Sequence, residues 1–326
     1  MVNVLKWIKR LLSRLVLIVI IFHFYSCGNL DVPVRDVTIE ITAERVAMGK
    51  QLAEGIMACG SCHTTGSFIE DPQQDKYLAG DVMYNQNFGN IRVGNLTPDK
   101  DTGLGNWTDG EIIRALTKGI HQNGRPLLPM MPWAFFGAAL TEEEVYSLVA
   151  YLRTVPDPVY NEVPKINKLK IPFSILSSSG ILYKMDLKNP IIQDYNYETT
   201  NAVERGKRLA FLGFCIGCHA YAPKMVPKYS EPLAGGLHFV SYKNKMIRGA
   251  NLTLDKETGI GSFKDEGLKQ AIKYGARLRP LENNDMVRWP MMQRIPFHTN
   301  LSDEEINDLI SFLRTQEPLK HDVLEK

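Results

Sequence analysis

The sequence Cys-x-x-Cys-His occurs twice in this chain and constrains its fold more than any other feature. It reads CGSCH from Cys59 to His63 and CIGCH from Cys215 to His219, an offset of 156 residues. Cysteines three positions apart lie on one face of a helical turn, so both thiols can bond the same planar group. The spacing predicts two sites at which a c-type haem is covalently attached.

Each motif provides two attachment thiols and one iron ligand. The expected thiols are Cys59, Cys62, Cys215 and Cys218, and the expected proximal ligands are His63 and His219. The second ring nitrogen of each histidine is expected to donate to a carbonyl that fixes its tautomer. A zinc site would favour cysteine pairs close together, and a redox dithiol needs no histidine after it, so two covalently attached haem c groups are favoured.

Residues 1–26 have the pattern of a signal peptide. A basic leader precedes a run from Leu15 to Phe24 that is apolar except for His23 and is too short for a comfortable membrane span. Cys27 follows this run and a serine, which predicts cleavage before Cys27 and its lipidation. An uncleaved anchor is the alternative. We expect an exported protein, held on the periplasmic side of a membrane by several acyl chains.

The net charge gives no indication of a nucleic-acid partner. The leader carries four of the 38 basic residues and none of the 36 acidic ones, so the rest of the chain has a net charge of −2. Haem propionates would make this charge more negative. A basic surface of the kind that binds phosphate backbones is therefore not expected.

The two halves of the chain repeat one another outside the motifs as well. NLTPDKDTGLGNW at 95–107 corresponds to NLTLDKETGIGSF at 251–263, and TEEEVYSLVAYLRT at 141–154 corresponds to SDEEINDLISFLRT at 302–315. The last two segments begin with capping boxes and continue with apolar residues at helical spacing, which predicts a terminal helix in each copy. A third capping box at Thr108 and Glu111 predicts a middle helix, and Gly49 and Gly206 would allow another helix to cross closely.

These patterns predict an all-α chain of two tandem domains. No segment alternates at a period of two for long. The expected organisation is a signal peptide at 1–26, a tether at 27–41, a first domain at 42–155, a linker at 156–198 and a second domain at 199–326. Five prolines in the linker argue against long regular structure in its first half, and its apolar residues suggest that it lies on the domains.

The sixth iron ligand separates an electron carrier from an enzyme. Each copy places two adjacent methionines between the haem motif and the terminal helix, Met130 and Met131 in PMMPW and their counterparts Met291 and Met292 in PMMQR. A thioether opposite histidine raises the reduction potential and closes the site. We predict Met131 and Met292 as ligands, with Met286 and His298 in reserve. His121 and His238 fit the surface or the propionate side better.

These motifs together resemble class I cytochrome c domains. More specifically, the chain from Arg45 to Thr315 is similar to the multihaem cytochrome c subunit of membrane-bound alcohol and gluconate dehydrogenases, including the linker segment NEVPKINKLKIPFSIL. The resemblance implies axial pairs of His63 with Met131 and of His219 with Met292. Fully developed subunits of this kind have a third haem domain, whereas this sequence contains two motifs.

The expected function is single-electron transfer by a dihaem cytochrome. The donor would be a membrane or periplasmic dehydrogenase or a quinol-oxidising complex, and the acceptor a terminal oxidase or a soluble cytochrome. We assign no catalytic residue. The alternative is a dihaem enzyme, a peroxidase or a thiosulfate-oxidising cytochrome, with one open or unusually ligated iron. A haem-based sensor ranks last because no output domain is visible.

Overall fold

The computed structural model describes residues 32–85, 89–154, 156–178, 201–223, 227–240, 246–281, 284–288 and 290–323. The predicted signal peptide and Cys27 lie outside this part of the chain, as does the linker from 179 to 200. In the described part, no helix is both long enough and apolar enough to cross a membrane.

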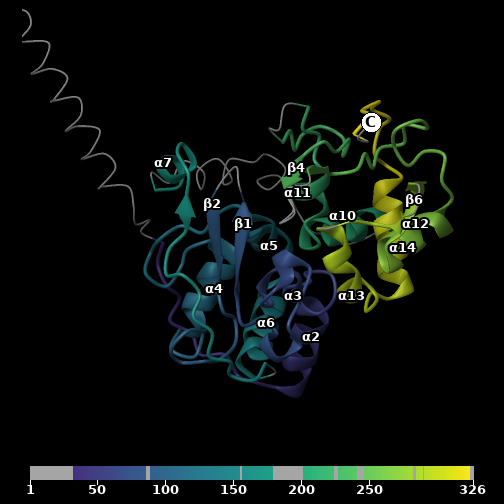
Figure 1. Cartoon of the computed structure of the whole chain (residues 1–326). Helices are drawn as coiled ribbons and strands as arrows, with labels where there is room; N and C mark the ends of the chain where they lie inside the picture. The colour runs from purple at the N-terminus through teal and green to yellow at the C-terminus, as the bar shows by residue number, and fades with distance from the viewer. Residues whose placement is uncertain are drawn as a thin grey trace, which may run out of the picture.

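Helices dominate both halves, and they recur in the same order. The first half contains α2 (Ala43–Ala53), α3 (Gly60–His63), α4 (Asp109–Lys118), α5 (Trp133–Ala139) and α6 (Glu142–Thr154). The second contains α10 (Ala202–Leu212), α11 (Cys215–His219), α12 (Asp265–Tyr274), α13 (Ile295–His298) and α14 (Asp303–Leu313). Figure 1 shows the halves side by side, the first in purple to teal and the second in green to yellow. The mostly helical fold is confirmed.

The first helix of each half crosses the terminal helix at backbone contact. A Cβ atom added to Gly49 would lie 2.0 Å from the Ser147 carbonyl oxygen, and one added to Gly206 would lie 1.8 Å from the Asp308 carbonyl oxygen. Only glycine leaves room for α2 against α6 and for α10 against α14. The close crossing predicted at both glycines is confirmed.

Side chains cap the helices as the sequence predicts. Thr108 with Glu111 and Ser302 with Glu305 form complete capping boxes at the starts of α4 and α14. At α6, the Glu144 amide donates to the Thr141 hydroxyl, and the Glu144 carboxylate accepts from the Thr141 amide. Each pair satisfies amide groups that a helix start leaves without partners.

Short strands are the main departure from an all-α fold. Strands β1 (Asp81–Asn85), β2 (Gly89–Val93) and β3 (Lys168–Leu169) form an antiparallel sheet. The second half has two-stranded pairs, β4 (His238–Val240) with β5 (Met246–Arg248) and β6 (Ala276–Leu281) with β7 (Asn284–Met286). These strands are too short and too mixed in polarity to show a period of two, and pairing between segments stabilises them. Four short helices complete the described elements: η1 (Ser67–Ile69), η2 (Gln74–Lys76), α7 (Phe173–Ser178) and η3 (Met291–Arg294).

The described part of the linker lies on the first half, as predicted. Its β3 strand extends the sheet of β1 and β2. The Asn161 amide group donates to the Ala79 carbonyl at 2.9 Å, and the Val159 carbonyl accepts from Asn95 at 2.8 Å.

The two halves share one hydrophobic core. The ring of Phe135, from α5, lies 5.4 Å from the rings of Phe211 and Phe214 and 6.0 Å from that of Tyr229, all edge to face. The Arg208 guanidinium donates to the Ala139 carbonyl at 2.8 Å and pairs with Glu144. Apolar and polar contacts of this kind fix the two repeats against one another.

An arginine lies at the C-terminal end of the terminal helix in each repeat, but the carboxylate that it binds is exposed to a different degree. Arg153 binds Asp109 and the carbonyls of Leu104 and Trp107, and the side chains of Arg153 and Asp109 are 18% and 13% exposed. Arg314 binds Asp265 in the same way, but the Asp265 side chain is 68% exposed.

We expect Arg153→Gln to lower the free energy of unfolding by about 2–3 kcal/mol, because it leaves a buried carboxylate and two carbonyls without their donor. Arg314→Gln is the matched control and should cost less, because water replaces the lost partner of Asp265. Urea denaturation of the haem-loaded variants measures both losses. Equal losses of unfolding free energy in the two variants would contradict the idea that the burial of Asp109 sets the cost.

Candidate haem-binding sites

Each Cys-x-x-Cys-His motif forms a single helical turn that begins at a backbone reversal. Ala58 and Phe214, the residues before the first cysteines, both have positive φ angles of 48° and 55°. Non-glycine residues adopt this conformation rarely, and here they do so at equivalent positions. In the first turn, a Cβ atom on Gly60 would lie 2.6 Å from ring atoms of Phe297 and Tyr77, so a larger residue would displace these rings.

The histidines of both motifs are oriented in the same way. Nδ1 of His63 donates to the Gly94 carbonyl at 2.7 Å, and Nδ1 of His219 donates to the Ala250 carbonyl at 3.0 Å. Burial lowers the pKa of His63 to about 4 and lowers that of His219 as well. Both rings are therefore neutral at pH 7, and their Nε2 atoms can bind a metal.

A repeated asparagine loop holds these carbonyls in place. Asn95 follows Gly94, and its side-chain oxygen accepts from the amide and the hydroxyl of Thr97 while its nitrogen donates to Thr102. Asn251 makes the same set of bonds in the second repeat. The NLT segments thus position the histidines indirectly, a role that their repetition in the sequence did not reveal.

A cavity of about 840 Å³ opens beside the first motif, lined by Cys59, Cys62 and His63. Met131 and Met130 line it as well, and so does Trp107. Met131 is half-buried, whereas Met130 is 47% exposed. The volume lies near the upper end of the ~300–1,000 Å³ typical of cofactor pockets. Thiols, a free imidazole nitrogen and a thioether sulfur around one apolar cavity fit a covalently attached haem.

The second site differs on its methionine side. Met292 is 39% exposed, and its neighbour Met291 is less so, the reverse of the order in the first repeat. His298 is buried, and its Nδ1 donates to the Ile272 carbonyl at 3.1 Å. Its Nε2 has no partner among the described residues. The side chain of Met286 lies outside the described part of the chain.

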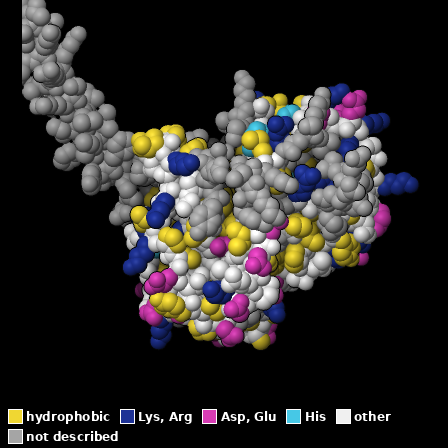
Figure 2. Space-filling view, in the orientation of Figure 1, with side chains coloured by type: hydrophobic (Ala, Val, Ile, Leu, Met, Phe, Trp, Pro, Cys, Tyr) yellow, Lys and Arg dark blue, Asp and Glu magenta, His cyan; other side chains and the backbone are white. Residues whose placement is uncertain are grey.

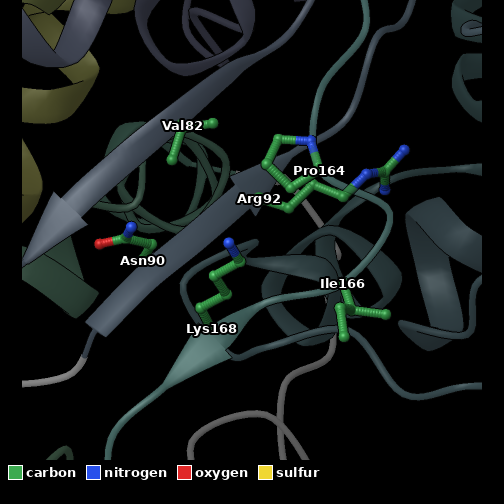
Figure 3. A pocket seen from close by; sticks show the side chains of 6 residues that line it. All are labelled: Val82, Asn90, Arg92, Pro164, Ile166 and Lys168. Carbon is green, nitrogen blue, oxygen red and sulfur yellow. The ribbon is translucent and has the colours of Figure 1, made fainter.

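Basic residues line one end of the first cavity. The sequence patterns did not predict them. Arg92 and Arg125 both belong to its wall, together with His121. Burial lowers the pKa of Arg92, and the charge of Arg125 lowers it further. A smaller cavity of about 140 Å³ adjoins this end, and Figure 3 shows Arg92 and Lys168 among its lining side chains. No periodic pattern marks these arginines, because they come from separate loops and strands.

Three residues of the second repeat also reach the first cavity. Leu212, Phe214 and Arg294 are part of its wall, although all three are more than 150 positions from Cys59. Phe214 directly precedes Cys215, so the second motif begins at the wall of the cavity that Cys59 and Cys62 line. The two Cys-x-x-Cys-His motifs are therefore neighbours at the boundary between the repeats.

Comparison with known proteins gives consistent results. The cytochrome c family profile matches residues 203–317. The chain is 32% identical over 265 residues to the fructose dehydrogenase cytochrome subunit of Gluconobacter japonicus, covering 79% of this chain and 50% of that protein. It is 25% identical over 272 residues to the gluconate 2-dehydrogenase cytochrome c subunit of Pantoea cypripedii, covering 79% and 56%.

A shorter match links the chain to a protein named as a dihaem cytochrome. It is 28% identical over 164 residues to the dihaem c-type cytochrome of Cereibacter sphaeroides, covering 49% of this chain and 52% of that one. The chain spans about half the length of these curated relatives. With two Cys-x-x-Cys-His turns in a mostly helical fold, these matches show that the chain belongs to the cytochrome c family and is homologous to the cytochrome c subunits of sugar and alcohol dehydrogenases.

Proposed function

We propose that this chain is a dihaem electron-transfer cytochrome, with one cytochrome c domain in residues 42–155 and a second in residues 199–326, joined by segment 156–198. It passes single electrons between a membrane or periplasmic donor and a terminal acceptor. The observation that carries the proposal is the position of both motifs at one boundary, because Phe214, which directly precedes Cys215, lines the same cavity as Cys59 and Cys62. Motifs placed in this way would bring the two haems together at the boundary between the repeats.

The side chains have separate roles in this proposal. The haem supplies reversible one-electron redox chemistry. Two thiols would hold each haem covalently, Cys59 and Cys62 in the first domain and Cys215 and Cys218 in the second. His63 and His219 are proximal ligands whose orientation is set by Gly94 and Ala250. Met131 and Met292 would supply the second protein ligand of each iron.

Arg92 and Arg125 are proposed to bind the haem propionates of the first domain. Both line the cavity, and Nε of Arg92 is buried without a hydrogen-bond partner in the described structure. A buried guanidinium without a partner is costly unless an anion satisfies it. A carboxylate at this end of the cavity would satisfy that nitrogen.

The partners are proposed from the named relatives. Those relatives are cytochrome subunits of fructose dehydrogenase, gluconate 2-dehydrogenase and quinone-dependent alcohol dehydrogenase. The donor would therefore be a dehydrogenase or a quinol-oxidising complex, and the acceptor an oxidase or a soluble cytochrome. Figure 2 shows acidic and basic side chains interspersed on one face, which suits weak, transient docking. Lipidated Cys27 would hold the chain at the periplasmic membrane surface.

One observation favours a second candidate, a dihaem peroxidase. Met292 is 39% exposed, so the second iron could have an exchangeable sixth position. The near-identical arrangement of both histidines argues against the division of labour that a peroxidase needs.

We expect Met131→Ala and Met292→Ala each to remove about half of the weak far-red absorption band of the oxidised protein, which reports iron bonded to methionine sulfur. Met130→Ala and Met291→Ala are the matched controls and should keep the band. If the wild-type band accounts for one haem only and the protein turns over peroxide, the peroxidase function would be favoured over electron transfer.

Replacing Cys59 and Cys62 together by alanine should leave one covalently bound haem per chain, because the second pair of thiols is separate. Intact-mass measurement counts the attached groups. Cys27→Ala should keep both haems and lose partition into detergent. Retention of two haems in the double variant would contradict the assignment of the first motif.

Arg92→Gln should lower the reduction potential of the first haem alone, by about tenfold in its equilibrium constant or about 59 mV. The reason is that a buried positive charge beside the site favours the reduced form. Redox titration of the variant measures both potentials, and Met131→Ala identifies which one belongs to the first domain. An unchanged first potential would argue against a propionate-binding role.

A further inference from the structure

Arg294 connects the second repeat to the first haem-binding motif. It is the last residue of η3, and its Nη2 donates to the carbonyls of Ile56 at 3.0 Å and Met57 at 3.1 Å. These carbonyls lie just before Cys59 in the chain. Arg294 also lines the 840 Å³ cavity of the first repeat. One side chain of the second repeat thus forms part of the first site.

The charge of Arg294 has no counter-ion in the described structure. Its hydrogen bonds go to neutral carbonyls, its Nε is buried without a partner, and no ion pair among the described residues includes it. Arg208 differs in this respect, since it also donates to a carbonyl of the first repeat but pairs with Glu144. A partly buried charge without a counter-ion acts over a longer range than a neutralised one.

Arg294 lies beside both motifs. It binds the Ile56 carbonyl, and the Ile56 side chain lies against Gly213 at the start of the second motif, where an added Cβ atom would be 3.0 Å from Ile56 Cδ1 and 3.3 Å from Cys215 Sγ. Arg294 also follows Met292, the proposed ligand of the second iron, by two positions. At the equivalent position of the first repeat stands Trp133, a fully buried aromatic residue without charge. The arrangement is therefore asymmetric, because the second repeat places a cation at the boundary and the first repeat places none at the equivalent position.

We propose that Arg294 is a shared positioning residue, which raises the reduction potentials of both haems by its fixed charge and ties the η3 segment to the start of the first motif. The inference rests on the proposed function, because it requires a haem at each motif. Reduction removes one positive charge from an iron centre, so a nearby cation stabilises the reduced form at both sites. Its hydrogen bonds to Ile56 and Met57 hold the charge in place between them.

The test is a redox titration of the haem-loaded full chain, followed by absorption at a fixed pH. Arg294→Gln should lower both potentials, each by about a tenfold change in the reduction equilibrium, or about 59 mV. Arg294→Lys keeps the charge and should restore most of both shifts, although it loses the geometry of the guanidinium. Arg294→Met is a second neutral variant that preserves the apolar stem, in case the glutamine variant does not fold.

Arg208→Gln is the matched control. It removes another arginine between the repeats, one whose charge Glu144 already neutralises, and should leave both potentials unchanged. A shift of one potential only would contradict the proposal that the charge of Arg294 acts on both haems. Equal shifts in Arg294→Lys and Arg294→Gln would contradict it as well, because lysine keeps the charge. Equal shifts in Arg208→Gln would show that loosening the interface is the cause, which also overturns it.

The same titration separates this inference from the function on which it rests. Two reversible one-electron couples in the wild type, unchanged in Arg294→Gln and Arg294→Met, would reject the role of Arg294 and keep the dihaem carrier. Fewer than two such couples in the wild type would reject the proposed function itself.

Discussion

The backbone crossing of the first and terminal helices in each repeat is the constraint on which the rest of the structure depends. At Gly49 and Gly206 the helices touch with no space for a side chain. A short segment joins each first helix to a Cys-x-x-Cys-His turn, from Ala53 to Gly60 in the first repeat and from Leu212 to Cys215 in the second, so the crossing limits where that turn can begin. The caps at Thr141 and Ser302 define where the crossing partner starts. A shift of either helix would move the cysteines relative to the rest of the cavity.

Contact between the repeats turns two similar sites into one connected unit. The Phe135 ring packs against Phe211 and Phe214, and Phe214 directly precedes Cys215. On the other side, Phe297 of the second repeat packs against Gly60 of the first motif. Each haem-binding turn is thus partly built from the opposite repeat. Such contacts favour a fixed geometry between the sites over independent domain motion.

Duplication has not made the two sites equivalent. Arg314 copies the bonds of Arg153, but its carboxylate partner is exposed instead of buried. The methionine pairs differ in which member faces water, and Arg294 replaces the aromatic Trp133. The differences at the methionines and at Arg294 lie beside the predicted sixth ligands and at the boundary between the repeats, where they would most affect the potential of a bound haem and access to it. The histidine side is the part that both repeats keep unchanged.

Local patterns in the sequence by themselves indicated the proposed haem attachment, the capping boxes and the helical character, because each depends on residues a few positions apart. Comparison of the two halves of the sequence showed the duplication. The strands at Asp81–Asn85 and Gly89–Val93 could not be predicted, since pairing with one another stabilises them more than any alternation of their own. Only the tertiary structure decided that Arg294 and Phe214 belong to the first cavity. The bond from Arg294 to Ile56 joins residues 238 positions apart. A contact at that separation leaves no periodic trace in the chain, because packing of the whole repeats brings the two residues together.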